Sequence, residues 1–169
     1  MHSFGLTTHP SWNGTSWSIG AEFFTYLVFA LVCLARPRWS LVLSIAIPVC
    51  AATGIALYSP HLINTDYDFG FVRCLYGFFT GVVLHQIFHR KPIRTFRKSP
   101  GFTLLECVIL GVVAAYIIVS YDNFGMMAAP LIFAPAIYVF AHEKGAVSRL
   151  LRTAPFQALG KWSYSIYMV

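Results

Sequence analysis

Long, almost uncharged apolar runs constrain the fold of this chain more than any other feature. Runs of about 20 such residues match an α-helix that crosses a hydrocarbon core roughly 30 Å thick. Only 11% of the residues are charged, against roughly 25% in soluble domains, which excludes a water-soluble globule. The runs lack the alternation of barrel strands, so they predict an all-α, polytopic transmembrane bundle. We expect five full spans and a truncated sixth, at 18–35, 40–58, 69–89, 102–120, 126–141 and 157–169.

Basic residues mark one side of the membrane. Lysines and arginines follow the first, third and fifth runs, whereas the alternate joints hold Asp66, Asp68 and Asp122 and no basic residue. By the positive-inside rule, the first, third and fifth spans run from outside to inside. The formal net charge of +6 is therefore a signal of topology, and we expect the lipid bilayer, not nucleic acid, as the partner.

A carboxylate inside the first run is the strongest candidate for chemistry. Glu22 lies about four residues, or roughly 6 Å, below the start of the span, where an ionised group is costly unless it is paired or functional. Ser18 precedes Glu22 by one helical turn and shares its helical face. The two residues predict a polar stripe that faces the protein interior.

Arg73 is the strongly basic residue inside a span, near the outer start of the third run. Because the first and third spans run in the same direction, we expect Arg73 at the depth of Glu22. We predict that the two residues form, or share, a buried polar network near the outer leaflet. A pair that only fixes helix packing is the alternative, since buried ion pairs often specify an arrangement without doing chemistry.

Other ionisable residues give weaker signals. Glu106 lies near the inner end of the fourth run, and we expect it to pair at the interface beside Arg97 and Lys98 rather than to catalyse. His85 and His89 share a helical face, but two histidines without a third ligand are a weak sign of a metal site, and we predict none.

Prolines and cysteines also fall inside the runs. Pro48, Pro130 and Pro135 remove helix hydrogen bonds and are expected to bend or interrupt their helices. The cysteines show no C-x-x-C spacing, so we expect buried thiols rather than disulfides or metal ligands. These are Cys33, Cys50, Cys74 and Cys107.

The first span resembles a family signature. The run SWNGTSWSIGAEFFTYLVFALV is similar to that of the acyltransferase 3 family of integral membrane O-acyltransferases, in which a tryptophan precedes an S-x-x-x-E motif and an aromatic-rich helix. Trp17, Ser18 and Glu22 match this motif residue by residue. Two later stretches resemble further family segments in the same order, RCLYGFFTGVVL with Arg73, Gly77 and Gly81, and LGKWSYSIYMV with Gly160, Ser163, Tyr164, Ser165 and Tyr167.

The resemblance implies transfer of an acyl group, commonly acetyl from acetyl-CoA, to a hydroxyl of a carbohydrate, cell-envelope glycan, lipid-linked saccharide or small natural product. It implies acyl-CoA as co-substrate, no tightly bound cofactor, and a bacterial inner (plasma) membrane. The residues expected to carry the chemistry here are Glu22, Ser18 and Arg73.

The family also has a catalytic histidine in its first helix and an R-x-x-R motif shortly after it. Arg94 to Arg97 match R-x-x-R in letters, but they follow the S-x-x-x-E helix instead of preceding it. The chain therefore resembles the C-terminal part of the family domain, without roughly the first three spans and the last helix, and we expect it to be inactive alone. A noncatalytic membrane scaffold or a transporter-like protein is the competing interpretation, because either would also carry kinked spans and buried charges.

Overall fold

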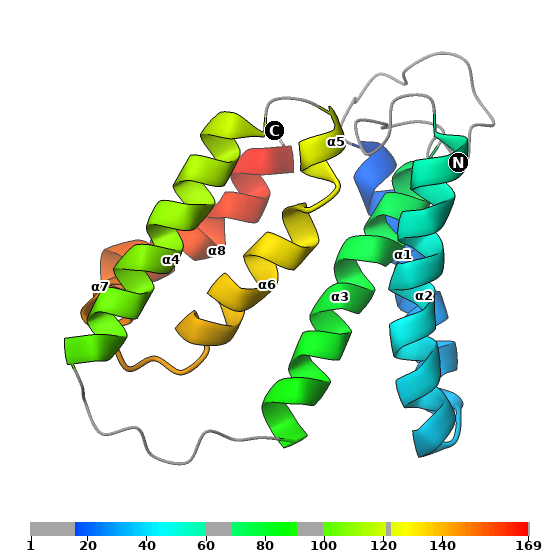
Figure 1. Cartoon of the computed structure of the whole chain (residues 1–169), viewed down its shortest axis with the longest axis horizontal. Coiled ribbons are helices and arrows are strands. Elements are labelled where there is room, and N and C mark those ends of the chain that lie inside the picture. The colour runs from blue at the N-terminus through cyan, green and yellow to red at the C-terminus, as the bar shows by residue number, and fades with distance from the viewer. Residues whose placement is uncertain (1–15, 60–68, 91–99, 121–122, 169) are drawn as a thin grey trace.

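The structure, a computed structural model, describes residues 16–59, 69–90, 100–120 and 123–168. Helices and turns make up these residues, with no strand among them (Figure 1), which confirms the all-α prediction. The R-x-x-R letters and the basic residues around them lie outside the described residues. The helices are α1 (Ser16–Leu34), α2 (Pro37–Tyr58), α3 (Gly70–Arg90), α4 (Pro100–Val119), α5 (Asn123–Met126), α6 (Ala129–Phe140), α7 (Ala146–Leu151) and α8 (Ala154–Met168).

The first four helices begin and end close to the first four predicted spans. Three helical stretches in the described residues are long and apolar enough to cross a membrane, namely Arg38–Tyr58, Gly70–His89 and Gly101–Val119. Ser18–Leu34 and Ala129–Phe140 are shorter apolar helices. An integral membrane protein follows from these helices, while the number of five full spans and a truncated sixth stays a prediction.

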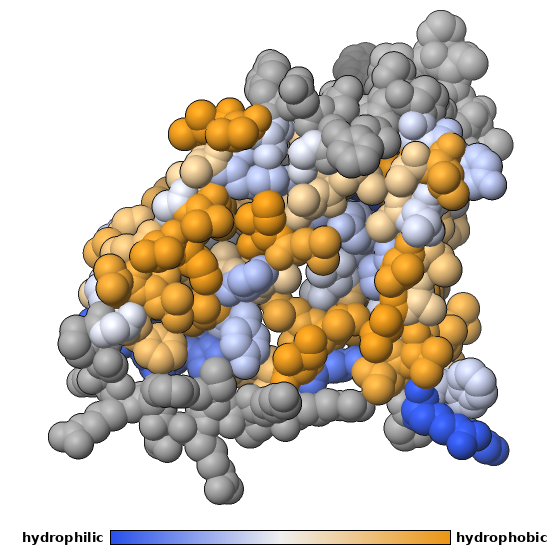
Figure 2. Space-filling view, viewed as in Figure 1, coloured by the Kyte–Doolittle hydropathy of each residue, from blue (hydrophilic) through white to orange (hydrophobic). Residues whose placement is uncertain are grey.

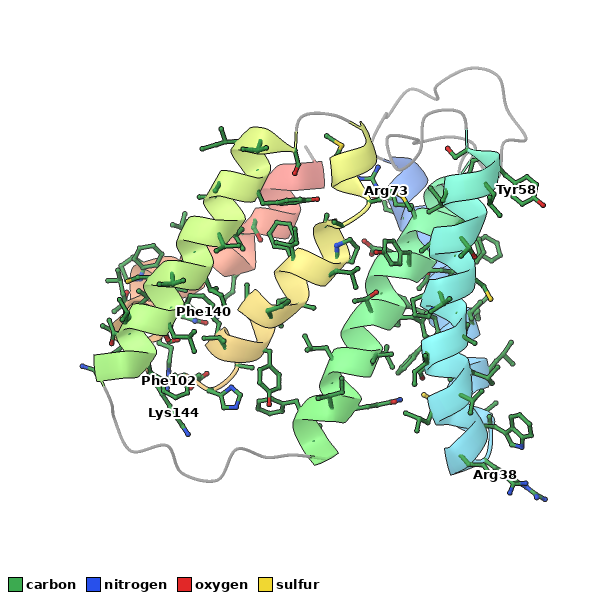
Figure 3. The ribbon with its side chains drawn as sticks, in the orientation of Figure 1. Arg38, Tyr58, Arg73, Phe102, Phe140 and Lys144 are labelled. Atoms are coloured by element: carbon green, nitrogen blue, oxygen red, sulfur yellow. The ribbon has the colours of Figure 1, made fainter. Side chains whose placement is uncertain are left out.

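The helices alternate in direction, so that α1 and α3 start at the same end of the molecule (Figure 1). Arg38 and Lys144 lie at one end, and Arg73 and Tyr58 lie at the opposite end (Figure 3). Apolar side chains cover much of the face between these ends, and the most hydrophilic residues gather at its lower edge (Figure 2). This is the distribution that a bilayer requires of a spanning bundle.

The fifth predicted span is interrupted just before its first proline, which lies in the first turn of α6. Pro130 has no N–H, and the N–H of Leu131 donates to the Ala128 carbonyl, so the Met127 carbonyl lacks the usual helical donors. The Tyr76 hydroxyl of α3 donates to that carbonyl at 2.9 Å, and the Tyr116 hydroxyl of α4 donates to the Gly125 carbonyl at 2.6 Å. The predicted interruption is thus present here, between α5 and α6, whereas α2 continues through Pro48 and α6 continues through Pro135.

Glu106 forms hydrogen bonds with a helix that is distant in sequence. Its side chain is fully buried and accepts hydrogen bonds from the amides of Gly145 (3.1 Å), Val147 (3.0 Å) and Ser148 (3.4 Å) and from the Ser148 hydroxyl. These groups belong to the first turn of α7, where unpaired amides and the helix dipole favour an anion. Glu106 thus forms a cap that joins α4 to α7, while Arg97 and Lys98, its expected partners, lie outside the described residues.

The cysteines correct the prediction of buried thiols. Cys33, Cys50 and Cys107 are exposed on the helix surfaces, Cys74 is half-buried, and all four are free thiols. Exposed cysteines are compatible with the apolar runs because the surroundings of a spanning helix are themselves apolar. Helical periodicity within a run of nearly uniform hydropathy does not identify the face that packs against protein.

Candidate functional site

The contact between α1 and α3 combines aromatic rings with small residues. The rings of Phe29 and Phe78 lie 5.4 Å apart and those of Phe24 and Phe71 lie 6.4 Å apart, each pair edge to face. One turn before Phe24 in α1, Ala21 is only 1% exposed. The small side chain lets the helices approach closely, and it leaves the neighbouring polar residues facing the partner helix.

A cavity of about 190 Å³ lies near the end of this contact at which both helices begin. All three site residues predicted from the sequence, Ser18, Glu22 and Arg73, line this cavity together. Figure 3 shows Arg73 at the upper end of α3, next to α1. The remaining lining comes from Ala21, Gly70, Cys74 and Gly77.

The helical phase explains why these residues meet. Ser18 and Glu22 are separated by one turn of α1, and Gly70, Arg73 and Gly77 recur at the spacing of one face of α3. Because both helices start at the same end of the bundle (Figure 1), a residue early in α1 lies opposite a residue early in α3. The predicted equality of depth for Glu22 and Arg73 therefore agrees with the structure.

The sequence analysis did not identify two further residues beside the cavity. Thr25 is fully buried, and its hydroxyl donates to the Ala21 carbonyl at 2.8 Å. Cys74, which lines the cavity, forms a side-chain hydrogen bond with Thr25 and lies close enough to Glu22 and Arg73 to interact with both charges. The available signal was their spacing, since Thr25 follows Glu22 by three residues and Cys74 follows Arg73 directly.

The described histidines lie elsewhere. The rings of His85 and His89 are 4.3 Å apart near the C-terminal end of α3, and His142 packs against Phe88 and Tyr138. None of them lines the cavity of Glu22. The described part of the chain also contains no group of three or more His, Cys, Asp or Glu residues that could hold a metal ion.

The cavity brings together a carboxyl, a guanidinium and a hydroxyl in an apolar surround. Charges in such a place interact more strongly than in water, because little solvent screens them. A guanidinium fixed there can stabilise a developing negative charge, and a carboxylate can orient a neighbouring base or cation. The arrangement is suited to a reaction that forms an oxyanion.

Comparison with known proteins identifies a family. A family model described as an acyltransferase domain matches residues 2–169. No curated protein matches, and no solved structure matches either. The match spans the helices that build the cavity, and it agrees with the resemblance noted in the sequence.

Proposed function

Since this chain belongs to the acyltransferase 3 family, we propose that the cavity between α1 and α3 serves transfer of an acyl group, in particular acetyl, from acyl-CoA to a hydroxyl of a carbohydrate or cell-envelope glycan. Family membership supports a membrane acyltransferase in general. The observation that carries the finer proposal is the presence of Ser18, Glu22 and Arg73 around one cavity. The setting we propose is a bacterial inner membrane.

The proposed reaction is direct transfer. A general base takes the proton of the acceptor hydroxyl while the hydroxyl oxygen attacks the thioester carbonyl carbon. A C–O bond forms, and the carbonyl oxygen becomes an oxyanion that the Arg73 guanidinium stabilises. Collapse of this intermediate breaks the C–S bond, and the thiolate leaves with the proton that the base had taken. The products are an ester and free CoA.

Glu22 and Ser18 act as positioning residues in this scheme. Glu22 holds Arg73 or the base in place, and Ser18, one turn away, donates a hydrogen bond within the same stripe. We assign the base to a histidine in polypeptide beyond this chain, as the family resemblance implies. Spans that precede these residues in the complete protein are accordingly part of the proposal.

The test uses the complete protein in lipid nanodiscs, with radiolabelled acetyl-CoA and a panel of glycan acceptors. Arg73→Met removes the cation at similar side-chain length, and we expect kcat to fall about 10²-fold to 10³-fold, the usual loss when an oxyanion stabiliser is removed. Glu22→Gln is expected to lower kcat about 10²-fold, because it leaves Arg73 or the base unoriented.

Glu143 and Arg152 provide matched controls. They form an exposed ion pair at 2.7 Å, with side chains 55% and 64% exposed, and such pairs contribute little to stability. Glu143→Gln and Arg152→Met are expected to leave kcat unchanged. If Glu22→Gln and Arg73→Met retained full turnover, the assigned roles would be wrong. A complete protein that never transfers acetyl would favour a scaffold or transporter.

A further inference from the structure

Three buried residues place the first helix against the bundle. Ala21, Thr25 and Val32 are the buried residues of α1 within 18–34, and their spacing puts them on one helical face. Thr25 is the polar member of this face, and it is fully buried. The position of α1 therefore depends on a narrow contact that contains a hydroxyl group.

The Thr25 hydroxyl gives its proton to its own helix. It donates to the Ala21 carbonyl at 2.8 Å, a bond that threonine side chains form within helices. A hydroxyl has one proton and two acceptor lone pairs. In its hydrogen bond with Cys74, Thr25 is therefore the acceptor and the Cys74 thiol is the donor. This Thr25–Cys74 hydrogen bond joins α1 to α3.

The Thr25–Cys74 hydrogen bond lies beside the proposed reaction centre. Thr25 follows Glu22 by three residues, or about 4.5 Å along α1, and Cys74 directly follows Arg73 in α3. Cys74 also lines the cavity together with Glu22 and Arg73. A rotation or a slide of α1 against α3 would therefore break the bond and move Glu22 relative to Arg73 at the same time.

Hydrogen bonds between helices are more directional than apolar contacts. In a bilayer the lipid tails are as apolar as the side chains that pack the helices, so no hydrophobic force selects one register. The aromatic pairs of α1 and α3 are apolar contacts of this kind. A thiol and a hydroxyl must meet within a narrow range of distances and angles. The Thr25–Cys74 hydrogen bond thus favours one register and one rotation of the two helices.

We propose that Thr25 and Cys74 are positioning residues for acyl transfer, and that their hydrogen bond aligns Arg73 with Glu22 and with the developing oxyanion. This inference rests on the proposed function and adds two residues that act through Arg73. Loss of the bond is therefore expected to slow the chemical step and to leave substrate binding unchanged.

The first experiment measures turnover by the complete protein in nanodiscs. Thr25→Val removes the hydroxyl at nearly constant size, and Cys74→Ala removes the thiol. Each variant is expected to lower kcat about tenfold with an unchanged KM for acetyl-CoA, because a small displacement of a catalytic group reduces the rate. Thr25→Ser keeps the acceptor and Cys74→Ser keeps the donor, so both are expected to retain a kcat close to that of the wild type. Equal losses in the conservative variants would overturn the inference.

Controls and a double variant separate positioning from a general structural defect. Thr53→Val and Cys50→Ala are expected to leave kcat unchanged, since Thr53 donates within α2 and Cys50 is exposed. In Arg73→Met the guanidinium is absent, so the addition of Thr25→Val is expected to cause no further loss of kcat. A structural defect would lower kcat by the same factor in both backgrounds, and that result would contradict the proposal. Thermal unfolding and gel filtration verify that each variant folds.

The second experiment observes the hydrogen bond itself and does not depend on turnover. The S–H stretching band of a thiol moves to lower frequency when the thiol donates a hydrogen bond. Subtraction of the infrared spectrum of Cys74→Ala from that of the wild type isolates the Cys74 band. The same subtraction in the Thr25→Val background is expected to give a band at higher frequency, and in the Thr53→Val background an unchanged band. A band that stays in place in Thr25→Val would show that the thiol donates elsewhere, and the inference would be wrong.

The outcomes separate the two proposals. If the wild-type protein transfers no acetyl group, the proposed function fails and the positioning role with it, whatever the infrared band shows. If wild-type turnover is normal but Thr25→Val has the same kcat as Thr53→Val, only the inference about Thr25 and Cys74 is wrong.

Discussion

Glu106 is a buried carboxyl whose hydrogen bonds come from an element far away in the sequence. Gly145, its first donor, lies 39 residues later. The carboxylate satisfies amides at the start of α7 that would otherwise lack partners, and these amides in turn compensate a charge within an apolar helix. The Glu106 carboxylate and the α7 amides therefore depend on each other for hydrogen bonds. Their contact fixes the position of α7 against α4.

Removal of this cap is expected to be costly. Glu106→Ala leaves the α7 amides and the Ser148 hydroxyl without their acceptor, and we expect the free energy of unfolding to fall by about 2 to 4 kcal/mol. Unfolding in mixed micelles with increasing SDS measures the change. Glu143→Ala, at an exposed carboxyl, serves as control. Equal stability of the two variants would contradict the capping role.

Gly145 allows a second test of the contact between Glu106 and α7. A Cβ added there would collide with the Glu106 carboxylate, so Gly145→Ala is expected to displace that carboxylate from α7. The double variant with Glu106→Ala should be more stable than the sum of the single losses predicts, because the collision is gone. Strictly additive losses in the same SDS unfolding series would argue against this geometry.

At the scale of elements, the break between α5 and α6 is held by tyrosines of other helices. Tyr76 and Tyr116 supply hydroxyl donors to carbonyls near the break. Tyr76 is also 5% exposed and packs in the cluster with Ala51, Met126 and Met127. The interruption is thus stabilised by the bundle, since other helices donate hydrogen bonds to the backbone carbonyls that lack helical partners near the proline.

We expect Tyr76→Phe to destabilise the protein by about 1 kcal/mol, the size of a hydrogen bond inside a membrane protein. The ring stays and only the hydroxyl is lost, so packing is preserved. Tyr58→Phe is the matched control, because Tyr58 is 76% exposed. The free energy of unfolding in SDS mixed micelles is the readout. A loss no larger than that of Tyr58→Phe would show that the Met127 carbonyl is satisfied in another way.

The elements that sequence predicts well are those that depend on local properties. Spans follow from runs of hydropathy, and the common depth of Glu22 and Arg73 follows from chain direction and helical phase. The partner of Glu106 and the short helix α7 could not be predicted, since both depend on contacts between residues far apart in sequence. For the same reason Thr25 and Cys74 were missed at the site, although their spacing is compatible with it.

For the whole molecule, the charge pattern predicts one topology. Arg38 and Lys144 lie at the end opposite Tyr58 (Figure 3). In a cysteine-free background, single cysteines introduced as Arg38→Cys and Lys144→Cys are expected to react with a membrane-impermeant maleimide only after the cytoplasmic side is opened. Tyr58→Cys is expected to react in intact cells. Labelling of all three from one side would contradict the orientation.

The Glu106 cap also has a consequence for how the protein is made. Translation delivers α4 to the membrane before the ribosome has synthesised the 39 residues that lead to Gly145. During that interval the translocon must accommodate a carboxyl group that has no binding partner. Once α7 has been synthesised, its amides satisfy this carboxyl, so the stability of α4 in the finished bundle depends on a segment that is made later.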